Sequence, residues 1–282
     1  MRRISSVSIF AILLTICNAS LAQLHHFGRS SNYFYNPAYT GMYNAHSVTL
    51  LGSPFACDVP DYRNLSGMYE GNIGKSNSVG VSYLYNQTAL SKSNMVSLFY
   101  SYSFAINDDV SIRLGISPTF DFRKIDNLYL YGDDPIFMPG SAKVNTFFLN
   151  TGAALKIKKF DFGFSVNSAT LYRSNGLYQY HPSCVMMSSY QWDIYENLTM
   201  TPNLQLFLPA NEYVSISLSD YFRIYRIFLL GGTIWHTSSS TKLGASCGLL
   251  LNEKFQLLFA YDRYNSTFDI NEYSALIRYV IK

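Results

Sequence analysis

Apolar and polar residues alternate along much of this chain. In residues 214–219, three aliphatic residues are separated by three serines, and the same two-residue period runs through residues 96–104, 160–167 and 255–262. Successive side chains of a β-strand point to opposite faces, so each stretch predicts a strand with one apolar face. The other face is mostly Ser, Gly, Asn and Ala. An apolar outer face and a polar inner face are typical of a β-barrel that spans a membrane.

The alternation predicts about fourteen strands, an even number as expected for a single-chain barrel with both ends on one side of the membrane. They lie near residues 46–53, 64–71, 78–86, 94–106, 110–121, 143–157, 160–169, 183–192, 197–208, 212–220, 223–235, 241–251, 254–262 and 273–281. The predicted fold class is therefore all-β, a transmembrane antiparallel up-and-down β-barrel.

The lengths of the connections indicate an orientation. After even-numbered strands they are short, at residues 107–109, 158–159, 193–196 and 252–254. After odd-numbered strands they are mostly longer, at residues 54–63, 122–142, 170–182 and 263–272, with 209–211 as a short exception. Bacterial barrels have short periplasmic turns and longer external loops. This alternation of short and long connections predicts that both termini are periplasmic.

The first 22 residues have the pattern of a secretory signal peptide. Arg2 and Arg3 precede an apolar stretch, Ile9–Cys17, and small residues follow at 20–22. That stretch is too short to span a bilayer as a helix. The predicted organisation is a signal peptide at 1–22, an N-terminal periplasmic or cap segment at 23–45 and an outer-membrane barrel at 46–282.

Composition supports an exported membrane barrel. Charged residues make up 14% of the chain, against roughly 25% in typical soluble domains. Aromatic residues reach 16%, mostly Tyr and Phe, which suit the interfacial girdles of a barrel. The net charge of +3 is scattered, which argues against a nucleic-acid partner and leaves outer-membrane lipid as the expected surroundings. Cys57, Cys184 and Cys247 have no metal-like spacing and are interpreted as unpaired thiols.

The residues that could carry chemistry do not form a recognisable active site. The chain has five histidines, His25, His26, His46, His181 and His236. Only His236, beside serines 238–240, allows even a nominal catalytic triad, and no G-x-S-x-G elbow supports it. Asp133 and Asp134 lack the spacing of a calcium loop. Lys156, Lys158 and Lys159 are interpreted as a charged strand end at the membrane interface. No enzyme activity, metal or cofactor is predicted.

One segment ahead of the first strand differs from the rest. Tyr33–Gly41 reads Y-F-Y-N-P-A-Y-T-G, in which Asn36-Pro37 starts a turn and Gly41 permits a positive backbone φ angle. Such a segment is rigid but irregular. It is interpreted as a cap on the barrel or as a plug inside it.

An ordered set of short motifs resembles the PorP/SprF family, outer-membrane components of the type IX secretion and gliding-motility machinery of Bacteroidetes. Asn36, Pro37, Ala38, Tyr39 and Gly41 match its N-P-A-Y-A-G motif, and Asp134, Pro135 and Phe137 match its D-P-x-F loop. Ile73-Gly74-Lys75, Val79-Gly80-Val81 and Tyr100-Ser101-Tyr102 match further strands, and Tyr261, Asp262 and Glu272 match the end of the chain. Asn271 stands where the family has His, and the family's Y-R-x-Q-W pattern is not recognisable.

The resemblance implies a role in the export or surface attachment of other proteins. The expected partner is a type IX secreted protein or a large surface adhesin, with periplasmic components of the secretion machinery as further candidates. A passive porin or solute transporter is the alternative; a ladder of facing charges in the lumen would favour it. A lipid-modifying barrel enzyme is a third class, which would need His236 bonded to both a serine and a carboxylate.

Overall fold

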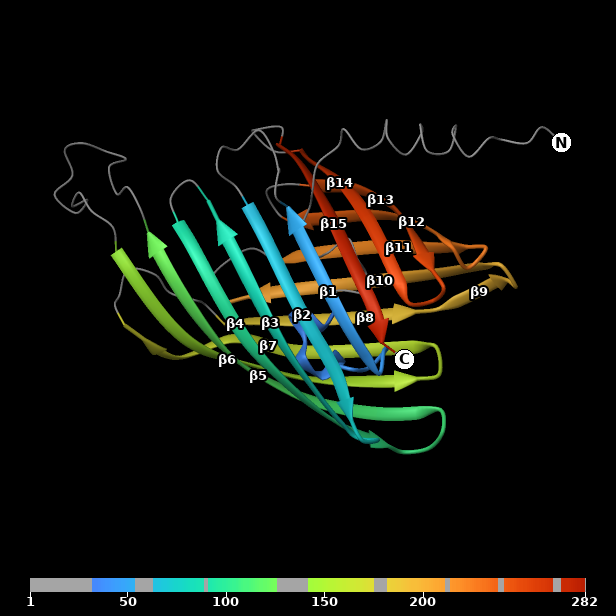
Figure 1. The fold of residues 1–282 in the computed structure, drawn as a ribbon, viewed down its shortest axis with the longest axis horizontal. Helices are drawn as coiled ribbons and strands as arrows, with labels where there is room; N and C mark the ends of the chain where they lie inside the picture. The colour runs from blue at the N-terminus through green and yellow to red at the C-terminus, as the bar shows by residue number, and fades with distance from the viewer. Residues whose placement is uncertain are drawn as a thin grey trace.

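The fold is a single closed antiparallel barrel (Figure 1). The structure is a computed structural model that describes residues 32–53, 63–88, 91–125, 142–174, 182–210, 214–237, 241–265 and 270–281. Its elements are α2 (Asn32–Tyr35), η2 (Pro37–Tyr39), β1 (His46–Ser53), β2 (Arg63–Ile73), β3 (Asn77–Gln87), β4 (Ser91–Ala105), β5 (Val110–Ile125), β6 (Ala142–Ile157), β7 (Phe160–Arg173), β8 (Ser183–Tyr190), β9 (Trp192–Tyr195), β10 (Leu198–Pro209), β11 (Ser215–Ile224), β12 (Phe228–Thr237), β13 (Thr241–Leu251), β14 (Phe255–Asn265) and β15 (Ile270–Ile281).

The strands close on themselves in chain order. Each strand pairs antiparallel with its neighbours in sequence, and β15 returns to pair with β1. Both β8 and β9 pair with β10, so they are two parts of one interrupted strand. The 15 strand segments of the described residues therefore make a barrel of fourteen strands. The predicted fold class and strand number are confirmed.

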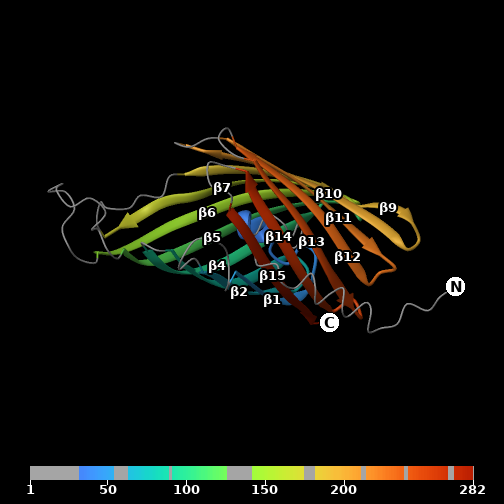
Figure 2. The same cartoon turned by 90° about the horizontal axis from the view of Figure 1, so that it is seen from above.

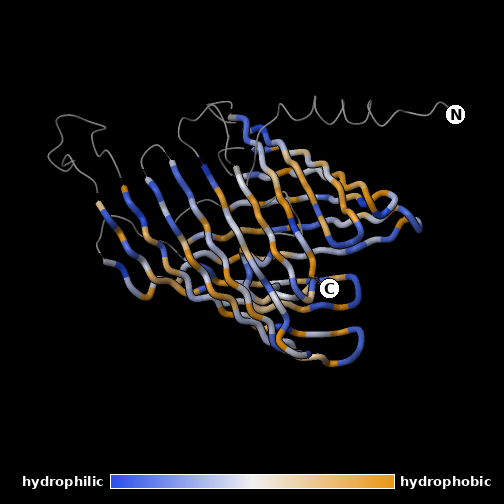
Figure 3. Tube along the Cα trace, viewed as in Figure 1, coloured by the Kyte–Doolittle hydropathy of each residue, from blue (hydrophilic) through white to orange (hydrophobic). Residues whose placement is uncertain are grey.

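Hydrophobic and hydrophilic residues alternate along the strands (Figure 3), and the exposure of their side chains alternates with them. On β11 and just before it, Val214, Ile216 and Leu218 are 45–50% exposed, whereas Ser217 and Ser219 are 1% exposed. Phe160, Phe162 and Phe164 on β7 point outward in the same way. The outer surface is thus a broad apolar band. Leaving it in water would be unfavourable, and surrounding it with lipid removes that cost.

The start of the first strand and the end of the last strand lie at the same end of the barrel. His46, the first residue of β1, pairs with Ile281, the last residue of β15. The short connections at residues 74–76, 106–109, 158–159, 196–197, 225–227 and 252–254 lie at this same end, which we call the turn end. In Figure 1 it is the side on which the C-terminus lies. The opposite end is called the loop end.

Two predicted turns are misplaced. Residues 193–196 were expected to be a turn, but Asp193 and Tyr195 belong to β9 and pair with β10. The break between residues 220 and 223 is also wrong, because β11 continues to Ile224 and the turn is Tyr225-Arg226. Both turn residues have positive φ angles of 51° and 60°, a conformation that Gly or Asn would have signalled. Glu272, placed in a loop from sequence, lies within β15.

The two described helical pieces, α2 and η2, are short. No helix in the described parts of the chain is long and apolar enough to cross a membrane. Both pieces lie inside the ring of strands, where Figure 2 shows the N-terminal segment enclosed by the sheet. They belong to the segment that the sequence interprets as a cap or a plug.

Candidate functional site: a plug in the lumen

The described residues ahead of the first strand, 32–45, fill part of the barrel lumen, and we call them the plug. Asn32, Asn36, Ala38 and Thr40 are 0% exposed, and Tyr39 is 1% exposed. The 3-10 helix η2 packs against β4, β5 and β6. Of the two interpretations of this segment, the inner plug is the one that the structure has.

The N-P-A-Y-T-G sequence folds the plug locally. The Asn36 side chain accepts a hydrogen bond from the Ala38 backbone N–H at 2.9 Å, which caps η2. Pro37 occupies the first helical position, where its missing N–H costs nothing. Gly41 then turns the chain with a φ of +66°. The motif therefore makes a compact turn with hydrogen bonds of its own.

The barrel wall holds this turn through hydrogen bonds to its backbone and to its Asn and Tyr side chains. Asn36 Nδ2 donates to the carbonyl oxygens of Ala153 and Phe164 at 3.0 and 3.2 Å. The Tyr39 hydroxyl donates to Asp161 Oδ1 at 3.2 Å. The Tyr39–Asp161 bond is buried and the two Asn36 bonds are partly buried, so losing a partner would weaken the hold of the wall on the plug.

Two charged wall residues hold the end of the motif. Arg113 on β5 donates to the Thr40 carbonyl at 2.7 Å, and Ser101 donates to the same oxygen at 2.9 Å. The Gly41 N–H donates to Glu70 Oε2 at 2.7 Å, and Ser47 donates to the other oxygen of that carboxylate. Glu70 and Arg113 are 3% and 8% exposed. Each buried charge is thus bonded to the plug.

Three wall glycines allow the plug to approach this closely. A Cβ atom on Gly115 would lie 2.2 Å from the Ala38 nitrogen, and one on Gly152 would lie 2.1 Å from Asn36 Oδ1. A Cβ on Gly163 would lie 2.5 Å from the Tyr39 ring. Real Cβ atoms essentially never come closer than 3.0 Å, so only glycine fits at Gly115, which faces the plug backbone. The wall and the plug are matched in shape.

Residues of β10 and β15 hold the first part of the plug. Gln205 on β10 donates to Asn32 Oδ1 at 3.0 Å, and Arg278 on β15 donates to the Tyr33 hydroxyl at 3.3 Å. The Arg278 guanidinium also lies 5.6 Å from the Tyr33 ring centroid. Burial raises the pKa of Tyr33, opposed in part by the Arg278 charge, and burial raises the pKa of Tyr35. Burial therefore favours the neutral form of both phenols.

A second cluster of buried charges joins two of the family-motif positions. Lys242 Nζ lies 3.4 Å from Asp262 Oδ2 and 3.2 Å from Glu272 Oε2, and all three side chains are almost fully buried in the lumen. Tyr261 lies on the outer face, where its hydroxyl donates to Asn271 at 2.8 Å. The sequence singled out Asp262 and Glu272 but not Lys242, which brings them together.

The sequence interpretation missed several lumen charges. It described the inward positions as mostly small and polar, with Asp161 and Asp262 among them, yet Glu70, Arg113, Lys242 and Arg278 also point inward. The sign that could have found them is a charged residue at an inward position of an alternating strand, such as Arg113 between Ile112 and Leu114. They are bonded to the plug or to each other, and do not form a ladder along an open channel.

The other candidate residues do not gather into a site. Asp134, Pro135, Phe137, Cys57, His25, His26 and His181 lie outside the described residues. His46 Nδ1 contacts the Tyr69 hydroxyl at 3.1 Å, and His236 Nδ1 contacts Thr241 Oγ1 at 2.9 Å. Cys184 and Cys247 are thiols on β8 and β13. Within the described ranges, no group of three or more His, Cys, Asp or Glu could hold a metal ion.

Two cavities flank the plug. A loop-end cavity of about 300 Å³ has Phe34 and Tyr35 of the plug in its lining. Its other lining residues combine apolar and small polar side chains, namely Ser82, Leu84, Met95, Ser97, Phe99, Thr119, Phe148, Asn150, Asn167, Ser168, Ser183, Val185 and Phe207. A turn-end pocket of about 380 Å³ lies on the other side of the plug and is lined by Tyr43, Asn44, Lys156, Lys158, Lys159, Gln191 and Arg278.

A closed barrel with an apolar outer band and a polar, plugged lumen defines the class, an integral β-barrel of the outer-membrane type. Solved structures agree in fold. The toluene transporter TbuX of Ralstonia pickettii has 10% identity and a TM-score of 0.58, covering 88% of this chain and 92% of that one. The CymD monoaromatic hydrocarbon channel also has 10% identity and a TM-score of 0.58, covering 88% and 91%. A Pseudomonas aeruginosa FadL homologue, 10% identical, has a TM-score of 0.54 and covers 88% and 93%.

Sequence comparison identifies the family. No functionally curated protein matches the chain. The family model of the type IX secretion system membrane protein PorP/SprF matches residues 16–275. The chain belongs to this family, as the resemblance of its motifs predicted. It is therefore a membrane protein of a type IX secretion system family.

Proposed function

We propose that this barrel docks an exported protein at the outer membrane and has no catalytic role of its own. The partner would be a type IX secreted protein or a large surface adhesin of the kind associated with gliding motility. It would be held at the loop end, while periplasmic components of the machinery meet the turn end. The observation that carries the proposal is the plug, which occupies the lumen and leaves a cavity at the loop end.

The proposed orientation puts the turn end in the periplasm. Short turns and both ends of the barrel sequence share that end, the arrangement usual in bacterial outer-membrane barrels. Residues 1–22 would act as a cleaved signal peptide, and residues 23–45 would enter the barrel from the periplasm. The loop-end cavity would then face the cell exterior.

The plug also argues against a passive porin. A porin needs a continuous aqueous path, but Asn36, Ala38 and Tyr39 are completely or almost completely buried against the wall. The plug covers and bonds two charged wall residues, so its departure from the lumen would expose or strand Glu70 and Arg113. Permanent occupancy by a matched segment fits a docking element better than a pore.

The loop-end cavity offers a suitable surface for an extended polypeptide. Phe99, Phe148 and Phe207 supply aromatic contacts, and Ser97, Thr119 and Asn167 supply hydrogen-bonding groups. Aromatic anchors surrounded by small polar groups are common where proteins hold a partner's chain. An inserted segment would rest on Phe34 and Tyr35 of the plug.

Co-purification tests the proposal. The affinity-tagged chain is expressed at its natural level, extracted from outer membranes with a mild detergent and analysed by mass spectrometry, with an unrelated tagged barrel as the control. We expect exported proteins with type IX signals, or periplasmic secretion components, to be enriched at least several-fold. Equal recovery of such proteins with both barrels would contradict the proposed function.

A further inference from the structure

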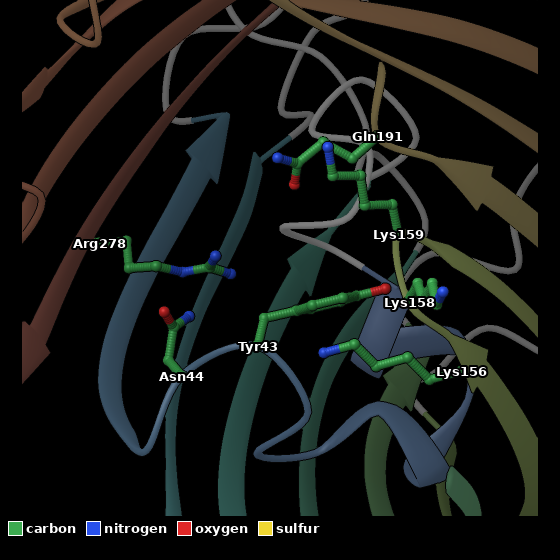
Figure 4. A pocket seen from close by; sticks show the side chains of 7 residues that line it. All are labelled: Tyr43, Asn44, Lys156, Lys158, Lys159, Gln191 and Arg278. Atoms are coloured by element: carbon green, nitrogen blue, oxygen red, sulfur yellow. The ribbon is translucent and has the colours of Figure 1, made fainter. Parts of the chain in front are cut away.

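The turn-end pocket is strongly basic (Figure 4). Lys156, Lys158 and Lys159 approach it from the end of β6 and the following turn, while Asn44 and Arg278 lie across from them. Tyr43 extends between the two groups with its hydroxyl toward the lysines. Among the described residues that line the pocket, four are basic and none is acidic.

Nearby carboxylates compensate only part of this charge. Lys158 pairs with Asp109 at 3.2 Å and Lys159 with Asp193 at 2.6 Å, and both pairs are largely exposed to water. Such pairs exchange readily with solvent and contribute little energy. The carboxylate that faces Lys156 across the sheet is Asp161, which already accepts hydrogen bonds from Tyr39 and Ser189.

Lys156 is the residue that makes the pocket a binding site. Ala154, two residues earlier on β6, is 3% exposed, whereas Ile157 is 40% exposed toward lipid. Lys156 therefore points to the lumen side, and not to the membrane interface as its sequence position suggested. Within the described part of the chain it has no ion pair or hydrogen bond. A lumen mouth walled by protein strengthens the attraction of such a cation for an anion.

The shape of the pocket favours a peptide over a lipid headgroup. Lys156 and Arg278 face the lumen, so the sheet separates them from lipid, while Lys158 and Lys159 lie in the exposed turn beyond the strand ends. These cations come from two places in the wall, the end of β6 with the following turn and the strand β15, and do not converge on one point, as they would around a single phosphate. The amides of Asn44 and Gln191 can bond to a peptide backbone between successive carboxylates.

We infer that the turn-end pocket binds an acidic peptide segment, rich in Asp and Glu, of a protein on the side that the short turns face. Lys156 and Arg278 would bond the carboxylates, and Tyr43 and Asn44 would bring the plug into the same contact. The identification of this side as the periplasm rests on the proposed function; the binding chemistry does not.

The test uses the purified full chain in a non-ionic detergent and a rhodamine-labelled octaglutamate peptide, followed by fluorescence anisotropy at low salt. We expect saturable binding that weakens as salt is added. Lys156→Gln should weaken it about fivefold or more, because a charge-assisted hydrogen bond is lost. Lys156→Arg, which keeps the charge, should stay within about twofold of the wild type. Lys75→Gln, at an exposed lysine in another short turn of the same end, is the matched control and should bind like the wild type.

Heat-modified mobility on gels verifies that each variant is folded. If Lys156→Gln does not fold, binding of octaglutamate by the wild-type and Lys156→Arg proteins still tests the inference. The inference is overturned if octaglutamate does not bind, if Lys75→Gln and Lys156→Gln weaken it equally, or if pyrophosphate binds through Lys156 and the peptide does not. If the peptide binds but neither exported proteins nor periplasmic secretion components co-purify, the pocket stands and the proposed function is refuted. If such proteins co-purify but the peptide does not bind, only the inference about the pocket is refuted.

Discussion

At the scale of single residues, contact between the plug and the wall depends on glycine. Gly115 faces the Ala38 nitrogen and the Pro37 carbonyl carbon at distances that exclude a Cβ atom. A Cβ atom on Gly232 of β12 would have nothing within 4 Å, so a methyl group there meets open space. These two glycines allow the fit of the plug to be tested with one kind of substitution.

Gly115→Ala is expected to destabilise the folded barrel by about 1–3 kcal/mol, because the added methyl group overpacks the plug against the wall. Gly232→Ala should leave stability unchanged within about 0.5 kcal/mol. The measurement is the temperature at which the folded form is lost on a gel. Equal stability of the two variants would mean that the plug does not lie on Gly115.

Lys242 is expected to stabilise the fold by neutralising two buried carboxylates. Lys242→Met would leave Asp262 and Glu272 buried without their cation, at a cost of about 3–5 kcal/mol. Lys158→Met, at an exposed pair with Asp109, should cost less than about 1 kcal/mol. Urea unfolding monitored by intrinsic fluorescence compares the two, and similar losses would show that the buried cluster is not structural.

At the scale of elements, turn chemistry decides where sequence interpretation succeeds. Asn252-Glu253 and Tyr225-Arg226 form the same kind of two-residue turn, with positive φ at both positions. Asn252 tolerates that conformation and marked its turn in the sequence, whereas Tyr225-Arg226 carries no such mark. Alternation identified the strands on both sides, but neighbouring apolar residues hid the break between them.

Replacing Tyr225-Arg226 by Asn-Gly should therefore stabilise the β11–β12 hairpin by about 1 kcal/mol, because Tyr and Arg lose the strain of a positive φ. The same urea experiment measures the gain. The matched change at Asn252-Glu253, Glu253→Gly, should give a smaller gain because Asn is already present. A loss of stability in the Tyr225-Arg226 variant would indicate that those side chains make contacts that outweigh the strain.

The plug is the element whose position the sequence could not decide. Its turn residues, Asn36, Pro37 and Gly41, indicated a rigid segment, but a cap and a plug need the same local chemistry. The difference lies in contacts with residues more than a hundred positions away, such as Ala153 and Phe164. The pairing of Lys242 with Asp262 and Glu272 escaped for the same reason, because periodicity reports which face a side chain takes and not its neighbour.

Planar-bilayer recording tests the plug. The wild-type barrel should show little steady conductance, while deletion of residues 23–45 should give a stable current. Asn36→Ala, which removes the cap of η2 and two bonds to the wall, should raise the open fraction about tenfold if it costs about 1.4 kcal/mol. A wild-type current as large as that of the deletion would favour the porin alternative.

At the scale of the whole molecule, the barrel presents three distinct surfaces. Its outer band faces lipid, its turn end carries a basic pocket, and its loop end carries an aromatic and polar cavity above the plug. Separate surfaces on the two sides of a lumen that holds a plug suit a protein that connects periplasmic machinery to an exported partner. The fold alone, shared with hydrocarbon transporters, does not distinguish these roles.

Photocrosslinking in living cells tests this account most directly. A benzoylphenylalanine placed at Phe207, in the loop-end cavity, is compared with one at Phe162, which is 40% exposed on the lipid face. The account predicts that an exported protein is crosslinked from position 207 and not from position 162. The absence of any exported protein at position 207, or equal crosslinking from both positions, would contradict it.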